Sequence, residues 1–256
     1  MTGACPKCGH EESWSVWMGS AELMGKCHRA QCGYTAPVDA MFAAPIKHRE
    51  PRYYTRPYKE PSAEQEVIIY KRFGLPPGTV TGYNEIDDRF ILSVDGPQHQ
   101  RRGVIAYSLS GAKPKSLTYK EKLEQPFVHW SHRLNPKAIV LVEDWFSAEK
   151  VSEAGATGVA LLGTNLSQDA VTEIKQVAAN WNVPTFVALD RDAYTKSLLY
   201  LSKYREQFAR GLYAWSLRVD LKYESVERIK RALNGEYDFT ARERDIGGDN
   251  GGQKSL

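Results

Sequence analysis

From Ala138 onward the chain alternates short apolar runs with stretches of helical composition, and this alternation is what most restricts its fold. The runs AIVLVE, TGVALLG, TFVALD and LYAWSLRVD each precede a segment that is typical of a helix. Strand-length runs that alternate with helices predict β/α units and a parallel sheet. Ser147, Ser167 and Ser225 are suitable helix caps, as is Ser62 earlier in the chain. We therefore predict an α/β fold, with four units over residues 138–233 forming a doubly wound layer sandwich.

Acidic residues stand where three of these runs end. Glu143 closes the first, Asp190 and Asp192 close the third, and Asp220 closes the fourth. Because ligands collect at the carboxyl ends of parallel strands, acids from different strands can converge on one hard cation. Two carboxylates one residue apart also repel each other unless a cation offsets them. This predicts a divalent-metal site; helix capping is the alternative for each acid, and we prefer it for Asp144.

The four cysteines of the chain form two pairs near the N-terminus. Cys5 and Cys8 lie in CPKC, and Cys27 and Cys32 lie in CHRAQC. Two turns that each present two thiolates can complete a tetrahedral zinc shell, which predicts one structural zinc ion in a small β ribbon. The second pair has a long spacing, so His28 is an alternative fourth ligand.

A basic segment lies between the cysteines and the apolar runs. Residues 45–137 contain 16 Lys and Arg against 10 Asp and Glu, interleaved with tyrosines. Such a surplus suits contact with a polyanion, although an ordinary solvated surface is equally compatible with it. The candidate phosphate-binding cations stand at the turns and edges of strand-like segments, where they could instead discourage strand aggregation. They are Arg101, Arg102, Lys113, Lys115, Lys120 and Lys122.

These patterns predict five parts. They are a zinc ribbon at 1–44, a proline-rich linker at 45–61, a basic mixed α+β subdomain at 62–137, the β/α layers at 138–233 and a disordered tail at 234–256. No apolar run has the length of a membrane span, and the first residues lack the features of a signal peptide, so we expect an intracellular protein without membrane contact.

The acids resemble those of a known domain family. The strand-end Glu143, the LGT turn at residues 162–164 and the DxD of Asp190 and Asp192 look like the TOPRIM domain of DNA primases, topoisomerases and some nucleases. The order of zinc ribbon, linker, basic segment and acids is similar to that of bacterial and bacteriophage primases. The resemblance implies a TOPRIM-type parallel-sheet layer sandwich. Three positions depart from the family pattern, since Asp144 replaces a glycine, Ser147 an aspartate and Tyr194 the glycine of an Ala-Gly pair. Asp144 is therefore a possible substitute ligand.

The resemblance also implies residue roles. Glu143, Asp190 and Asp192 would be catalytic ligands of Mg²⁺ or Mn²⁺, with Asp220 a further acid, and Lys113 and Lys115 would lie near the nucleotide or template path.

The activity implied is synthesis of short RNA primers from ribonucleoside triphosphates on single-stranded DNA, by a DNA-directed RNA polymerase of primase type. The chain has no GxxxxGK[ST] motif, so ATP-driven unwinding would come from a separate replicative helicase. The resemblance implies a location in the bacterial cytoplasm, which would be the host's if the chain is encoded by a phage. A metal-dependent TOPRIM nuclease and a noncatalytic zinc-ribbon nucleic-acid-binding protein are the alternatives. A topoisomerase fits less well, because 256 residues leave little room for a strand-passage gate.

Overall fold

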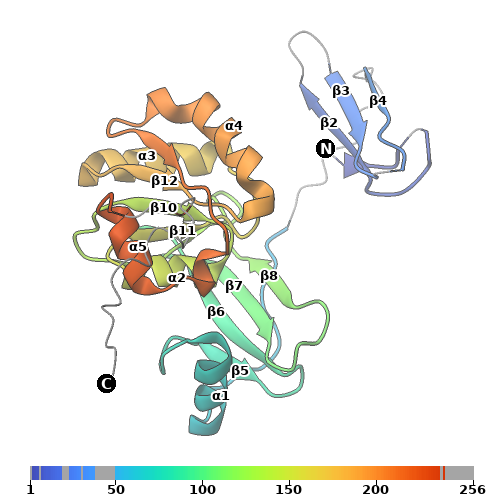
Figure 1. Cartoon of the computed structure of the whole chain (residues 1–256). Helices are drawn as coiled ribbons and strands as arrows, with labels where there is room; N and C mark the ends of the chain where they lie inside the picture. The colour runs from blue at the N-terminus through green and yellow to red at the C-terminus, as the bar shows by residue number, and fades with distance from the viewer. Residues whose placement is uncertain are drawn as a thin grey trace, which may run out of the picture. The chain divides into compact units, whose positions relative to one another are not determined.

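The chain divides into two units, Met1–Glu50 and Pro51–Leu256. The structure, a computed structural model, describes residues 2–5, 7–18, 23–29, 31–37, 50–236 and 239 (Figure 1). Residues 45–49 of the predicted linker and nearly all of the predicted tail lie outside the described residues. None of the described helices combines the length and the apolar composition of a membrane span.

The first unit is a four-stranded antiparallel sheet in the order β1-β2-β3-β4. Its strands are β1 (Thr2–Gly3), β2 (Trp14–Met18), β3 (Leu23–Cys27) and β4 (Thr35–Pro37). Trp14 is buried with Cys5 and Cys27. Its indole lies so close to Gly25 that a Cβ there would be 2.1 Å from Trp14 Cζ2. Trp14 is therefore the core of this small sheet.

The second unit begins with a mixed subdomain. Helix α1 (Ala63–Phe73) begins after Ser62, which forms a capping box with Gln65. The strands that follow form an antiparallel sheet in the order β5-β6-β7-β8. They are β5 (Gly82–Asn84), β6 (Arg89–Asp95), β7 (Arg101–Ser108) and β8 (Ser116–Lys120).

Part of the predicted linker lies along this sheet. The backbone N–H of Arg52 donates to the carbonyl of Lys120 at 2.9 Å, and Lys59 forms a bridge with Tyr83. Tyr54 packs edge-on against Tyr119, with ring centroids 5.1 Å apart. Residues 51–61 therefore belong to the second unit and pack against its antiparallel sheet.

The rest of the second unit is built on a five-stranded sheet in the order β13-β12-β10-β11-β9. Strands β10 to β13 pair in parallel, and β9 adds an antiparallel edge that the sequence pattern does not indicate. The elements are β9 (His129–Trp130), β10 (Ile139–Val142), α2 (Trp145–Glu153), β11 (Thr157–Ala160), α3 (Gln168–Trp181), β12 (Thr185–Val187), α4 (Tyr194–Tyr204), β13 (Leu212–Ala214) and α5 (Val226–Leu233).

Helices cover both faces of this sheet (Figure 1). Alternate residues of β10 point to opposite faces, as the period of a strand requires. Ile139 packs in the same cluster as residues of α3 and α4, whereas Val140 packs with residues of α2 and α5. The predicted alternation of strands and helices over residues 138–233 is thus confirmed as a mixed α/β architecture.

Two local predictions need correction. Helix α2 begins at Trp145 with Asp144 as its N-cap, because the Asp144 carboxylate accepts hydrogen bonds from the backbone N–H groups of Phe146 and Ser147. Ser147 is therefore inside the helix. Strand β13 ends at Ala214, so Asp220 does not directly follow a strand but precedes the short 3₁₀ helix η4 (Leu221–Tyr223).

Candidate metal and nucleotide-binding site

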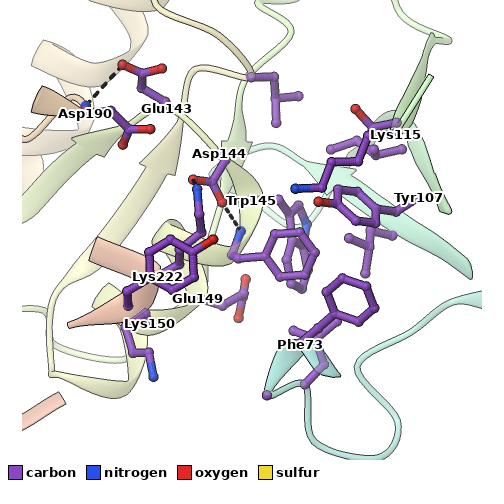
Figure 2. A pocket seen from close by; sticks show the side chains of 18 of the residues that line it. Phe73, Tyr107, Lys115, Glu143, Asp144, Trp145, Glu149, Lys150, Asp190 and Lys222 are labelled. Atoms are coloured by element: carbon purple, nitrogen blue, oxygen red, sulfur yellow. Dashed lines mark hydrogen bonds and ion pairs between the residues drawn. The ribbon is translucent and has the colours of Figure 1, made fainter. Parts of the chain in front are cut away.

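Glu143 and Asp190 come together because β10 and β12 are neighbours in the parallel sheet. Each residue follows its strand closely, and both side chains are half-buried. Glu143 Oε1 accepts a hydrogen bond from the backbone N–H of Asp190 at 3.1 Å. This contact, drawn in Figure 2, holds the first acid against the segment that carries the second. Asp192 lies two residues further on and is exposed.

Negative charge is concentrated at this edge of the sheet. Burial raises the pKa of Glu143, and the charges of Asp192, Asp220 and Asp144 raise it further, against a backbone hydrogen bond that lowers it. Burial, then the charge of Glu143, raises the pKa of Asp190 to about 7. Crowded carboxylates of this kind are stabilised as anions when a cation joins them.

The carboxylates are close without forming a preassembled ligand shell. Within the part of the chain that the structure describes, the four cysteines are the one group of three or more Cys, His, Asp or Glu whose ligand atoms all lie within 4.8 Å of one another. Glu143 and Asp190 nevertheless offer oxygen ligands from neighbouring strands, which is the donor chemistry that Mg²⁺ and Mn²⁺ prefer.

Asp144 contacts the start of α2, the Ser147 hydroxyl and Lys222. It caps α2 and also receives a hydrogen bond from the Ser147 hydroxyl at 2.8 Å. Lys222 Nζ lies 3.1 Å from Asp144 Oδ2 and 2.9 Å from Asp220 Oδ2. The preferred interpretation of Asp144 as a helix cap is confirmed. Lys222 was missed by the sequence reasoning, although its place two residues after Asp220 was a usable signal.

The acids open into a cavity of about 690 Å³ in the second unit. One side carries Glu143, Asp144, Asp190 and Lys222, and the mixed subdomain contributes Phe73, Tyr107 and Lys115 across from them (Figure 2). The aromatic and cationic lining includes Arg72, Phe73, Tyr107, Lys115, Trp145, Phe146 and Lys150. Only Lys115 among these was singled out from the sequence, because the others reach the cavity through the packing of α1, β7 and α2.

The aromatic wall is a packed cluster. Phe73 stacks on Phe146 with ring centroids 5.7 Å apart, and Tyr107 meets Phe146 edge-on at 5.1 Å. Lys115 Nζ lies 5.4 Å from the Tyr107 ring centroid, at cation–π distance. A flat aromatic ligand and an anionic group could therefore be held next to each other here.

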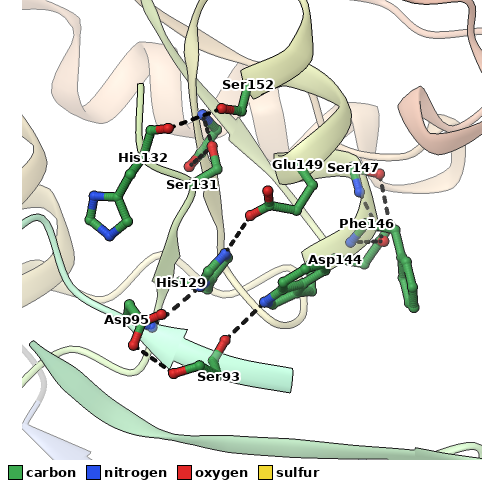
Figure 3. Close-up of polar contacts among 12 residues, drawn as sticks. Ser93, Asp95, His129, Ser131, His132, Asp144, Phe146, Ser147, Glu149 and Ser152 are labelled. Atoms are coloured by element: carbon green, nitrogen blue, oxygen red, sulfur yellow. Dashed lines mark hydrogen bonds and ion pairs between the residues drawn. The ribbon is translucent and has the colours of Figure 1, made fainter. Parts of the chain in front are cut away.

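Polar contacts fix the helix that carries part of this wall (Figure 3). His129 accepts from the backbone N–H of Asp95 at 3.2 Å and lies 3.0 Å from Glu149 on α2. The indole N–H of Trp145 donates to the carbonyl of Ser93 at 2.9 Å. Because Ser93 and Asp95 belong to β6, these contacts join the antiparallel sheet to the start of α2, next to the acids.

The predicted phosphate-binding cations separate into different environments. Arg102 is fully buried and binds the carbonyl of Pro126 and the carboxylate of Glu173, so its assignment as a phosphate ligand is wrong. Arg101 pairs with Glu121 at 2.8 Å. Lys115 lines the cavity, and Lys113 is exposed outside the cavity lining. Lys120, at the end of β8, is half-buried.

The cysteines of the first unit form a site suited to zinc. Cys5 Sγ lies 3.9 Å from Cys32 Sγ, and Cys8 Sγ lies 3.8 Å from Cys27 Sγ. A tetrahedron with Zn–S bonds of about 2.3 Å has edges of about 3.8 Å, so four thiolates at these separations fit one Zn²⁺. A hydrogen bond from the His10 backbone lowers the pKa of Cys8 to about 6, which favours the thiolate. His28 instead contacts Ser15.

No protein-family model and no curated protein matches the chain. Several solved structures are similar to it. A DnaG primase catalytic domain bound to single-stranded DNA is 18% identical, with a TM-score of 0.44, over 66% of this chain and 61% of that one. The zinc-binding and RNA polymerase domains of Aquifex aeolicus primase are 18% identical, with a TM-score of 0.47, over 69% and 50%. The Escherichia coli primase catalytic core is 16% identical, with a TM-score of 0.44, over 70% and 64%.

All three are primase domains, the family that the sequence motifs resemble. The chain spans between half and slightly less than two thirds of the length of each matched structure.

Proposed function

We propose that the chain is a DNA-directed RNA polymerase of primase type, which joins ribonucleotides into short primers on single-stranded DNA. The observation that supports this most is that Glu143 and Asp190, from neighbouring parallel strands, face a cavity whose opposite wall is aromatic and cationic. Nucleotidyl transfer requires oxygen ligands for divalent ions, aromatic rings that stack on a base, and cations that bind phosphates. This cavity offers all three.

In this proposal Glu143, Asp190 and Asp192 hold Mg²⁺ or Mn²⁺. The bound ions would lower the pKa of the attacking 3′ hydroxyl and neutralise the triphosphate. The carboxylates do not act as nucleophiles; they position the charge at the cavity edge. Lys115, at the cavity wall, would bind phosphate oxygens and steady the charge on the leaving pyrophosphate.

The zinc ribbon is proposed to read single-stranded template. Trp17 is 43% exposed, so its ring is available to stack on a base, whereas Trp14 is committed to the core. The ribbon would depend on zinc for its fold, because a domain this small has little other core. A separate helicase would open the duplex, and replication in a bacterial cytoplasm, of a phage or of the cell, would be the setting.

The test is incubation of the zinc-loaded chain with single-stranded templates, labelled ribonucleotides and Mg²⁺ or Mn²⁺, with the products sized on a gel. Short template-dependent oligomers are expected. Asp190→Ala and Asp192→Ala should each abolish them while leaving the fold and the zinc content intact. A matched control is Asp169→Asn, an exposed acid in the first turn of α3 that lies outside the cavity lining.

Three results would contradict the proposal. Unchanged synthesis in both Asp variants would refute the assigned acids. Metal-dependent cleavage of DNA without nucleotide incorporation would indicate a nuclease that uses water as the nucleophile. DNA binding with no divalent-ion requirement and no product would indicate a noncatalytic binding protein.

A further inference from the structure

Lys222 is held between two acids of the candidate site. Its ammonium forms ion pairs with both Asp144 and Asp220, and about a quarter of the side chain is exposed. Although burial alone would lower the pKa of Lys222, the charges and hydrogen bonds of its two partners raise that pKa well above its ordinary value. The side chain is therefore a permanent positive charge inside the cavity lining.

The five acids at this edge of the sheet fall into two groups. Asp144 and Asp220 share Lys222. In contrast, Glu143, Asp190 and Asp192 form no ion pair with any residue that the structure describes. One group is thus paired within the protein, whereas the other has no ion-pair partner among the described residues and is open to a cation from solution.

We propose that Lys222 is a built-in cation that takes the place of one metal ion, so that the free protein binds a single divalent ion on Glu143, Asp190 and Asp192. An ammonium and a divalent cation repel each other and compete for the same carboxylate oxygens, so Asp144 and Asp220 are closed to a second ion while Lys222 is present. The second ion of the proposed reaction would then arrive with the triphosphate, whose oxygens carry it. This inference rests on the proposed metal site and makes Lys222 a positioning residue.

The test counts Mn²⁺ ions bound by the zinc-saturated full chain without nucleotide, using electron paramagnetic resonance titration. The unaltered chain should bind one ion. Lys222→Met keeps an unbranched side chain that is one atom shorter and removes its charge, so this variant should bind two. Lys222→Arg keeps the charge and should still bind one. The matched control is Lys150→Met, which removes another lysine of the cavity lining and should also leave the number at one.

A double variant keeps the test valid if Lys222→Met alone is poorly folded. Asp144→Asn preserves a capping side chain for α2 while removing one of the two charges that Lys222 balances. Combined with Lys222→Met, it should return the number of bound ions to one.

The outcomes separate this inference from the proposed function. Two ions in the unaltered chain, or the same number and affinity in the chain and in Lys222→Met, would overturn the role of Lys222 while leaving the metal site standing. No Mn²⁺ binding by the chain or by any variant would overturn both the metal site and this inference.

Discussion

Arg102 and Glu173 form an ion pair that joins the antiparallel sheet of the second unit to helix α3, which packs on the five-stranded sheet. Arg102 lies in β7 and is fully buried, and its Nη1 donates to Glu173 Oε1 on α3 at 3.0 Å. The same carboxylate accepts from the indole N–H of Trp130 at 2.9 Å. The pair thus fixes the antiparallel sheet relative to the helix layer of the parallel sheet, and the cavity lies in the same unit.

Removing the acid of this pair should be costly. We expect Glu173→Ala to lower the free energy of unfolding by about 3–5 kcal/mol, because it leaves a buried guanidinium without a counter-charge. Urea unfolding followed by tryptophan fluorescence measures this. The control Glu85→Ala breaks the exposed Lys59–Glu85 pair and should cost less than about 1 kcal/mol. Equal losses in the two variants would show that the buried pair has no special role.

Loss of one cysteine should unfold the first unit selectively. Cys27→Ser removes a buried thiolate of the proposed zinc site, so we expect no bound zinc and an unfolded β2–β3 sheet. The second unit should keep its thermal transition. Zinc content and two-dimensional NMR spectra test this. His28→Ala should keep one zinc ion per chain, since His28 lies beside Ser15 and not among the thiolates. Zinc loss in His28→Ala would instead make this histidine a ligand.

Two neighbouring lysines should differ in their effect on nucleotide use. Lys115 lines the cavity and Lys113 does not. Lys115→Met should therefore raise the KM for ribonucleotides about tenfold, the equivalent of one lost charge-assisted contact of ~1.4 kcal/mol. Lys113→Met should change it less than about twofold. Steady-state primer synthesis at varied nucleotide concentration measures both, and equal effects would remove Lys115 from the proposed phosphate contacts.

His132 should make the second unit less stable in mild acid. Burial, and then the nearby His99 and His129, lower the pKa of His132. In the unfolded chain His132 takes up a proton near pH 6.5, whereas in the folded chain it does so only at lower pH. The contribution of His132 to stability therefore falls as the pH drops through about 6.5. His132→Phe keeps a ring against His99, with which His132 stacks at 3.4 Å. The urea midpoint of that variant should fall less than that of the unaltered chain between pH 7.5 and 5.5; parallel curves would contradict this.

Local sequence patterns were sufficient for the elements and for part of the site. The apolar runs placed β10 to β13, and the capping serines at 62, 167 and 225 mark the starts of α1, α3 and α5. Glu143 and Asp190 could be found because parallel strands end at a common edge. The cysteine spacing predicted the zinc site because each pair of thiolates lies within one short turn.

Only the tertiary structure decided which charged side chains pair with each other and which residues line the cavity. Lys222 meets Asp144 across 78 positions, and Arg102 meets Glu173 across 71. The local sequence around Arg102 predicts a surface cation, because it is the same whether the guanidinium points to solvent or pairs with a buried acid. Burial and ion pairing depend on how distant elements pack, and no periodicity within one segment contains that information.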